Sequence, residues 1–280
     1  MTRSFFTLSQ ACEKRSSLKE CLRKKYNNLN LNTFISFSSF SMSVEENIFL
    51  ARVAEQAERF EDMVDFLALV LDTKGADVTS DERNLLSVAF KNLISSKRAA
   101  CRTIAAIEQN PKYSKFSDAL ATYKASIETK LTEDCQRVID MIKEKVLSKA
   151  GSEGEAKAFF VKMVGDYYRY IAENAKDSLL EEVKQKALQA YTQANGITLP
   201  PCNPIKLGLA LNFSVFHYEV MKNHKAACEL ADQALQEALD KIDELEEDDF
   251  RDAKSIIELL KENLTLWKEE EEDDNQIDDL

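Results

Sequence analysis

Apolar residues recur at intervals of three and four along most of this chain, which is the period of an amphipathic helix. The clearest case is the segment 112–147, where the residues at this spacing are Phe116, Leu120, Tyr123, Ile127 and Leu131. Breakers such as Asn110-Pro111 and Asn195-Gly196 interrupt the pattern. Thr79 followed by Glu82 has the form of an N-terminal capping box. The pattern therefore predicts long helices joined by short turns.

Nine helices are predicted in this way. They occupy about 45–58, 59–73, 80–108, 112–147, 155–174, 178–195, 204–221, 225–245 and 248–268. Gly and Pro are scarce, with six and four in 280 residues, and the long stretches between them are rich in Ala, Leu, Glu and Lys. The predicted fold class is all-α, an antiparallel helical array.

Both ends of the chain depart from this pattern. Residues 1–41 hold seven Lys or Arg and two Glu in a chain of net charge -12, with many Ser and Phe. We interpret 1–41 as an N-terminal extension, either a targeting segment, a mobile arm, or a stretch not translated if Met42 is the start. The helical domain follows at 42–268, and 269–280 is predicted to be an acidic disordered tail. Its eight carboxylates could solubilise the chain or compete with a ligand for a basic site.

Composition excludes several classes of function. The net negative charge argues against general nucleic-acid binding, and no apolar run approaches the length of a membrane span. None of the six Cys forms a CxxC pair, so we expect reduced thiols and a cytoplasmic protein, with a nuclear location as an alternative. His224 and Cys228 lie one helical turn apart but lack further ligands, so no metal is predicted. No catalytic motif or cofactor-binding loop is present, and no enzyme activity or cofactor is expected.

Basic residues share a face on two predicted helices. Lys91, Arg98 and Arg102 fall on one stripe of a helix, and Lys162 and Arg169 on one face of another. One interpretation is a solvated face that pairs with local carboxylates. The other is an anion site, because two guanidinium groups, an ammonium and a phenol such as that of Tyr170 form the set that a phosphate dianion requires.

Two further helices carry apolar stripes that contain an Asn. One stripe holds Leu211, Asn212, Val215 and Glu219, and the other Ile256, Leu259, Asn263 and Trp267. These stripes could be ordinary core. They could instead form a groove for an extended peptide, because an Asn amide can pair with a peptide backbone while its neighbours contact side chains.

Several long strings closely resemble the 14-3-3 family. They are RNLLSVAFKNL (83–93), KMVGDYYRYIAE (162–173), NPIKLGLALNFSVFHYE (203–219), LLKENLTLW (259–267) and AEQAERFEDM (54–63). The resemblance runs in order from about residue 45 to 268. It implies nine antiparallel helices around a concave amphipathic groove, a dimer, and recognition of phosphoserine or phosphothreonine without catalysis.

The resemblance also implies roles for individual positions. The phosphate pocket would be Lys91, Arg98, Arg169 and Tyr170. The peptide groove would be Lys162, Asp166, Leu211, Asn212, Val215, Glu219, Ile256, Leu259, Asn263 and Trp267, with Arg102 supporting the basic cluster. This sequence departs from the family at Phe90 (usually Tyr), Cys101 (commonly Trp) and Ser255 (usually aliphatic).

The implied dimer contacts depart as well. Arg59 and Asp62 would meet Lys130 and Ser126 of a second copy, where the family usually has opposite charges at both contacts. Apolar contacts would come from Val53, Ala57, Ile104 and Tyr123. We expect a homodimer, or a heterodimer with a paralogue, weaker than usual.

The predicted function is a phosphorylation-dependent adaptor that sequesters, masks or bridges client proteins. The alternative is an acidic helical scaffold that binds unphosphorylated helices or unfolded segments.

Overall fold

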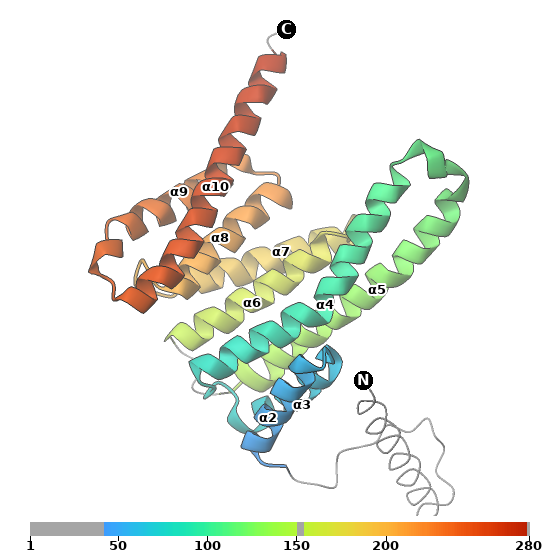
Figure 1. Ribbon diagram of the computed structural model, residues 1–280. Coiled ribbons are helices and arrows are strands. Elements are labelled where there is room, and N and C mark those ends of the chain that lie inside the picture. Colours follow the sequence, from blue (N-terminus) through green and yellow to red (C-terminus); the bar gives the residue numbers. More distant parts are fainter. Residues whose placement is uncertain (1–41, 150–153, 279–280) are drawn as a thin grey trace, which may run out of the picture. The chain divides into compact units, whose positions relative to one another are not determined.

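The computed structural model describes residues 42–149 and 154–278, so the predicted extension 1–41 lies outside the described residues. The described residues form nine α-helices (Figure 1). They are α2 (Val44–Gln56), α3 (Phe60–Lys74), α4 (Ser80–Glu108), α5 (Ser117–Ile142), α6 (Gly154–Ala172), α7 (Asp177–Asn195), α8 (Pro204–Glu219), α9 (His224–Leu239) and α10 (Glu247–Asp278). The all-α prediction is confirmed.

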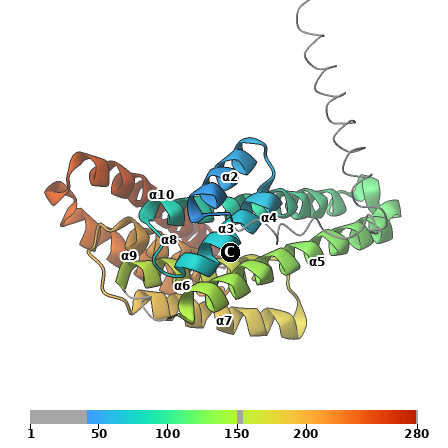
Figure 2. The ribbon, with the colours of Figure 1, turned by 90° about the horizontal axis from the view of Figure 1, so that it is seen from below.

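Helices that follow one another in sequence pack as pairs. The closest partners are α2 with α3, α4 with α5, α6 with α7, and α8 with α9 (Figure 1). Contacts of α3 with α4, of α6 with α5 and α8, and of α10 with α8 and α9 join these pairs (Figure 2). Within 44–280, α6 therefore lies between the α4–α5 pair and the C-terminal helices, where it can share a site with both.

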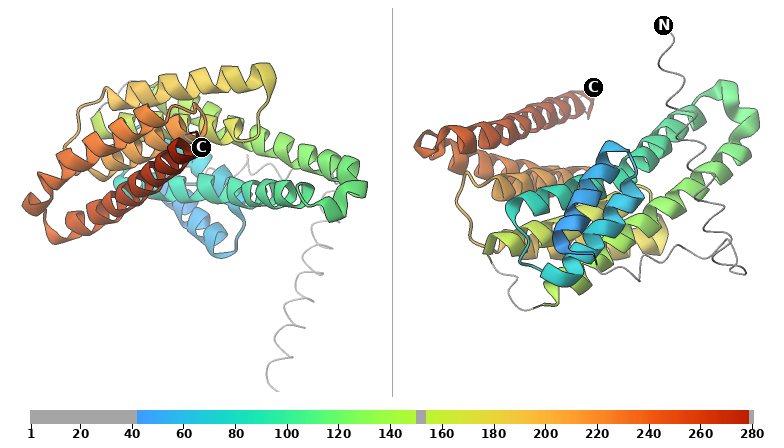
Figure 3. Two further views of the ribbon diagram at one scale, coloured as in Figure 1. Left: turned by 90° about the horizontal axis from the view of Figure 1, so that it is seen from above. Right: turned by 60° about the horizontal axis from the view of Figure 1, so that its bottom comes forward.

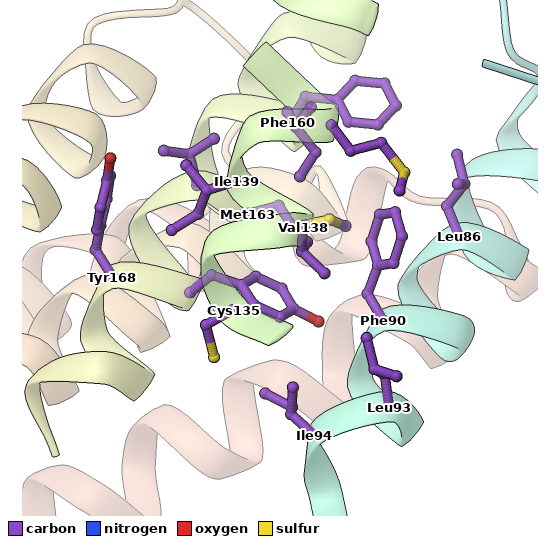
Figure 4. Packing of buried hydrophobic residues seen from close by; sticks show 14 of the residues in the cluster. Leu86, Phe90, Leu93, Ile94, Cys135, Val138, Ile139, Phe160, Met163 and Tyr168 are labelled. Carbon is purple, nitrogen blue, oxygen red and sulfur yellow. The ribbon is translucent and has the colours of Figure 1, made fainter. Parts of the chain in front are cut away.

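Two apolar clusters hold the helices together. The larger runs from α2 to α8, and the smaller joins α8, α9 and α10. Figure 4 shows Leu86, Phe90 and Leu93 of α4 pointing towards Val138 and Met163. Phe90 is fully buried and meets Tyr167 edge-on, with ring centroids 6.4 Å apart. Burial of one such aromatic side chain contributes about 1.5–3 kcal/mol, and it fixes the opposite, cationic face of α4 outward.

Helix ends follow the local sequence signals. The capping box before α4 is confirmed, because Thr79 Oγ1 accepts from the Glu82 backbone N–H at 3.2 Å and Glu82 Oε2 accepts from the Thr79 N–H at 2.8 Å. Asn203 caps α8 through hydrogen bonds from the backbone N–H groups of Ile205 and Lys206, with Pro204 at the first helical position.

Two predicted boundaries were wrong. The segment 112–147 is not one helix, because it begins as a 3-10 turn (Pro111–Phe116) and ends in a π-helical turn (Lys143–Leu147). Helix α10 runs to Asp278, past the predicted helix end at 268. The segment after Trp267 holds no Gly or Pro and begins with a run of Glu, a good helix former, so no stop signal ends the helix there.

The described residues include four cysteines. None of their four cysteines forms a disulfide, and burial raises the pKa of Cys135 to about 12. No cluster of metal-binding side chains was found among them, and none of their helices is long and apolar enough to cross a membrane.

Candidate functional site

Helices α4 and α6 bring together the arginines that the sequence places on two separate stripes. Arg98 of α4 makes a two-pronged ion pair with Glu173, just past the end of α6, with Nη2–Oε1 at 2.6 Å and Nε–Oε2 at 3.1 Å. Arg169 of α6 approaches the same carboxylate, with its Nη1 3.5 Å from Glu173 Oε1. The guanidinium groups of two helices thus converge on one point.

Glu173 is the acid that this cluster shares. Besides Arg98 and Arg169, its Oε2 lies 3.6 Å from Nη2 of Arg102. Three guanidinium groups around one carboxylate leave a net positive charge. This charge favours the binding of an anion at the position of Glu173. Glu173 is not among the site residues predicted from the sequence. The signal was present, because Glu173 follows Arg169 by four residues, the spacing of an ion pair on one helix face.

Tyr170 contacts both arginines. The Cζ atoms of Arg98 and Arg169 are 4.0 and 4.7 Å from its ring centroid, within the range of cation–π contact. Burial, followed by the nearby Asp166 carboxylate, raises the pKa of Tyr170. The phenol therefore stays protonated at neutral pH and can donate a hydrogen bond.

Lys91 is the fourth predicted phosphate-binding residue. Its side chain is exposed and makes no ion pair or hydrogen bond with the described part of the chain. Three of the four predicted residues are thus gathered, and the Lys91 ammonium is available on the stripe that Arg98 occupies.

Asp166 is the polar centre beneath this cluster. It is 7% exposed. Its carboxylate accepts hydrogen bonds from Lys162 Nζ at 2.8 Å, the Tyr191 hydroxyl at 2.7 Å and Asn212 Nδ2 at 2.8 Å. Helices α6, α7 and α8 meet in these bonds, so the predicted groove residues Lys162, Asp166 and Asn212 do form one network.

Tyr191 of α7 links that network to Arg169. It is fully buried, stacks on Phe213 with ring centroids 5.2 Å apart, and its hydroxyl lies 3.4 Å from Nε of Arg169. Burial alone would lower the pKa of Arg169, but the Tyr191 and Tyr170 phenols and the Asp166 carboxylate raise it. The guanidinium is therefore held charged and in place from below. Tyr191 was missed because no spacing in the sequence relates it to α6.

The apolar stripes on α8 and α10 divide between core and surface. Leu211, Val215 and Ile256 are half-buried and pack against the C-terminal apolar cluster, whereas Leu259 is 47% exposed. Trp267 was predicted to line the groove, but it is 4% exposed and stacks on Tyr218, with ring centroids 4.7 Å apart. The indole is therefore chiefly core.

The two Asn amides differ in their hydrogen bonding. Asn212 is bound to Asp166. Asn263 is half-buried and has no hydrogen-bond partner within the described residues. Its amide can therefore pair with an incoming backbone at no cost in existing bonds.

A cavity of about 500 Å³ adjoins the basic cluster. Its walls come from α4, α5, the α6–α7 turn and the end of α8. It shares Arg98, Arg102, Glu173 and Glu219 with the predicted site and its immediate surroundings. Cys101, also in its wall, is buried, and burial together with Glu128 raises the pKa of this thiol.

The residues predicted for a dimer interface lie mainly on the surface. Val53 and Tyr123 are 46% and 60% exposed, and Ala57, Ser126 and Lys130 are also exposed. Arg59 pairs with Asp62 of its own helix, with Nη2–Oδ1 at 3.0 Å. Ile104 is 7% exposed and belongs to the chain's own interior, so it adds little contact area.

Exposed apolar residues not singled out in the sequence lie on the same helices. Phe49 on α2 is 65% exposed, and Ile107, one turn after Ile104 on α4, is 36% exposed. A dimer face on these helices would use them more than Ile104. The sequence does contain a sign of this face, because Ile107 follows Ile104 by three residues and so lies on the same side of the helix.

Comparison with known proteins agrees with this architecture. The family model described as 14-3-3 protein matches residues 50–268. The "14-3-3 protein 5" of Solanum lycopersicum is 43% identical over 237 residues, covering 82% of this chain and 92% of the relative. The "14-3-3 protein 3" of Entamoeba histolytica is 44% identical over 238 residues, covering 83% of this chain and 98% of the relative.

Proposed function

We propose that this chain, which belongs to the 14-3-3 family, is a cytoplasmic phosphoserine- and phosphothreonine-dependent adaptor. Proteins of this family are adaptors rather than enzymes. A phosphorylated segment of a client would bind along α4, α6, α8 and α10, and the client would be sequestered, masked or bridged to another client.

The observation that carries the proposal is the convergence of Arg98 and Arg169 on Tyr170 and Glu173. Each guanidinium can donate paired hydrogen bonds to phosphate oxygens, and the phenol adds a third donor. Lys91 would supply the fourth. Such a set discriminates a phosphate dianion from a hydroxyl, because a hydroxyl would leave the cations without an acceptor.

Binding in this site would be an exchange of anions. In the structure, Glu173 occupies both prongs of the Arg98 fork, at 2.6 and 3.1 Å. A phosphate can take over one or both prongs while Arg102 and Arg169 keep the carboxylate nearby. Glu173 is thus an internal counter-ion that holds the forks in position for the ligand.

We expect Arg98→Ala to weaken phosphopeptide binding at least about 100-fold, since charge-assisted bidentate pairs are the strongest contacts in such a site. The measurement is fluorescence anisotropy with one Arg-rich peptide in phosphorylated and unphosphorylated forms. Lys225→Ala, at a lysine whose side chain is 84% exposed and far along the chain on α9, should bind as wild type.

Equal binding of both peptides, or of neither, would contradict the proposal. The chain would then be an acidic helical scaffold for unphosphorylated segments.

We also propose that the chain dimerises through α2, α4 and α5, using the exposed Phe49, Val53, Ile107 and Tyr123. Lys130 is exposed and makes no ion pair within the described residues, and it would meet Arg59 of a second copy. Such like charges weaken a homodimer and favour a paralogue with a carboxylate at this position.

We expect Lys130→Glu to tighten the homodimer. The contact occurs twice in a two-fold dimer, and an exposed pair contributes about 0–1 kcal/mol, so dissociation constants should fall about three- to tenfold. Analytical ultracentrifugation over a concentration series measures this, with Lys225→Glu as the matched charge reversal outside the interface. Unchanged self-association in Lys130→Glu would refute the contact.

A further inference from the structure

The cavity beside Arg98 holds cations that the proposed phosphate pocket does not use. Four basic side chains line it: Arg98, Arg102, Lys124 and Lys176. Three carboxylates line it as well: Glu128, Glu173 and Glu219. Because these groups come from four separate elements, their charges act on one shared space of about 500 Å³.

Two of the four cations already have close ion-pair partners. Arg98 is held by both oxygens of Glu173. Lys124 pairs with Glu108 at 2.9 Å and lies 3.9 Å from Glu128. These pairs account for two of the three lining carboxylates.

The other two cations have no firm partner in the described residues. Arg102 is 69% exposed, and its one ion pair is the long 3.6 Å contact to a Glu173 oxygen that Arg98 already uses. Lys176, in the turn before α7, is exposed, and its ammonium group makes no ion pair or hydrogen bond there. Glu219 is the lining carboxylate that makes no ion pair with the described residues, so the side chains of Arg102 and Lys176 keep hydrogen-bond donors available at the cavity mouth.

We infer that Arg102 and Lys176 form a second anion subsite, which binds a second phosphorylated side chain on the same client segment. The inference rests on the proposed function, because Arg98 and Glu173 border both pockets and one extended segment would occupy them together. A phosphate suits the subsite better than a carboxylate, since it brings nearly two charges and three strong acceptors to an arginine and a lysine. Glu219 sets a limit, because it repels any anion placed near the end of α8.

The subsite is tested with fluorescein-labelled peptides that share one central phosphoserine. A second phosphoserine is placed two to six residues away on either side, one position per peptide, and each position also has an unmodified Ser control. Each peptide is titrated by anisotropy against wild type, Lys176→Glu and Lys225→Glu. Lys176→Glu changes an exposed side chain, so it should fold as wild type, and its circular dichroism and melting temperature check this.

We expect at least one spacing at which the second phosphate tightens binding about five- to tenfold in wild type and in Lys225→Glu. Lys176→Glu should lose that gain and still bind the singly phosphorylated peptide within about twofold of wild type. The gain should also shrink between low and physiological salt, because the subsite is open to solvent.

A second phosphate that gives no gain at any spacing would overturn the inference. So would a gain that survives in Lys176→Glu. A different result would refute the proposed function: equal binding of the singly phosphorylated and unmodified peptides. Even then, the comparison of doubly with singly phosphorylated peptides still decides the subsite.

Discussion

Replacement of Asp166 with Ala should destabilise the protein by about 3–5 kcal/mol, the cost of breaking a buried charged network by removing one partner. The carboxylate is the acceptor for Lys162, Tyr191 and Asn212, from three helices. Without it the buried Tyr191 hydroxyl loses its acceptor, and the buried Arg169 loses a carboxylate that favours its charged form. Urea-induced unfolding at fixed protein concentration measures the loss.

Two control variants separate charge, hydrogen bonding and simple loss of a surface ion pair. Asp166→Asn keeps the size and one acceptor oxygen, so it should lose clearly less stability than Asp166→Ala. Asp72→Ala removes a carboxylate that is 52% exposed and pairs with Lys145 at 2.7 Å, and it should cost no more than about 1 kcal/mol. If Asp166→Ala were as mild as Asp72→Ala, Asp166 would not be the centre of a buried network.

Gly165→Ala should destabilise the protein by about 1–3 kcal/mol through overpacking, even though Ala is the better helix former. A Cβ at this position would lie 2.9 Å from Cδ1 and Cε1 of the Tyr191 ring. The ring cannot easily withdraw, because it is fully buried and stacked on Phe213. Any shift of Tyr191 also moves its hydroxyl away from Asp166 and Arg169, so phosphopeptide affinity should fall with stability.

Gly208→Ala is the matched control, because the substitution is the same and the site is also within a helix. Its added Cβ would lie 3.6 Å from Cε of Lys162, an ordinary contact with a flexible side chain. It should therefore stabilise the protein by up to about 1 kcal/mol, the usual gain of Gly→Ala in a helix. Equal melting temperatures for the two variants would contradict the close packing of Tyr191 on α6.

The sequence predicts the fold well because helix periodicity, caps and breakers are local. Thr79 with Glu82 and Pro204 after Asn203 mark helix starts that the structure reproduces. The face of α4 that carries Arg98 and Arg102 is also a local property. Periodicity alone left that face as either solvated or ligand-binding, and the convergence on Glu173 and Tyr170 appears only once α4 and α6 pack together.

Other parts of the site depend on contacts that no local pattern encodes. Tyr191 lies 25 residues after Asp166, and only the packing of α7 on α6 brings its hydroxyl to that carboxylate. Trp267 and Leu259 belong to one apolar stripe in the sequence, yet the first is buried and the second is half-exposed. The two side chains differ in exposure because the two positions of α10 lie at different depths in the C-terminal apolar cluster. The spacing of residues in the sequence does not predict this depth.

The continuation of α10 to Asp278 bears on how far the acidic end of the chain can travel (Figures 1 and 3). A helical residue advances about 1.5 Å, whereas an extended one advances about 3.3 Å. The Tyr218 hydroxyl donates a hydrogen bond to Glu270, which holds the first part of this segment beside α8. A segment that stays helical along the axis of α10 cannot turn back towards the arginines. Competition between this segment and a client would therefore require the last turns of α10 to unfold. The distance that the acidic segment can reach would then depend on the stability of these turns.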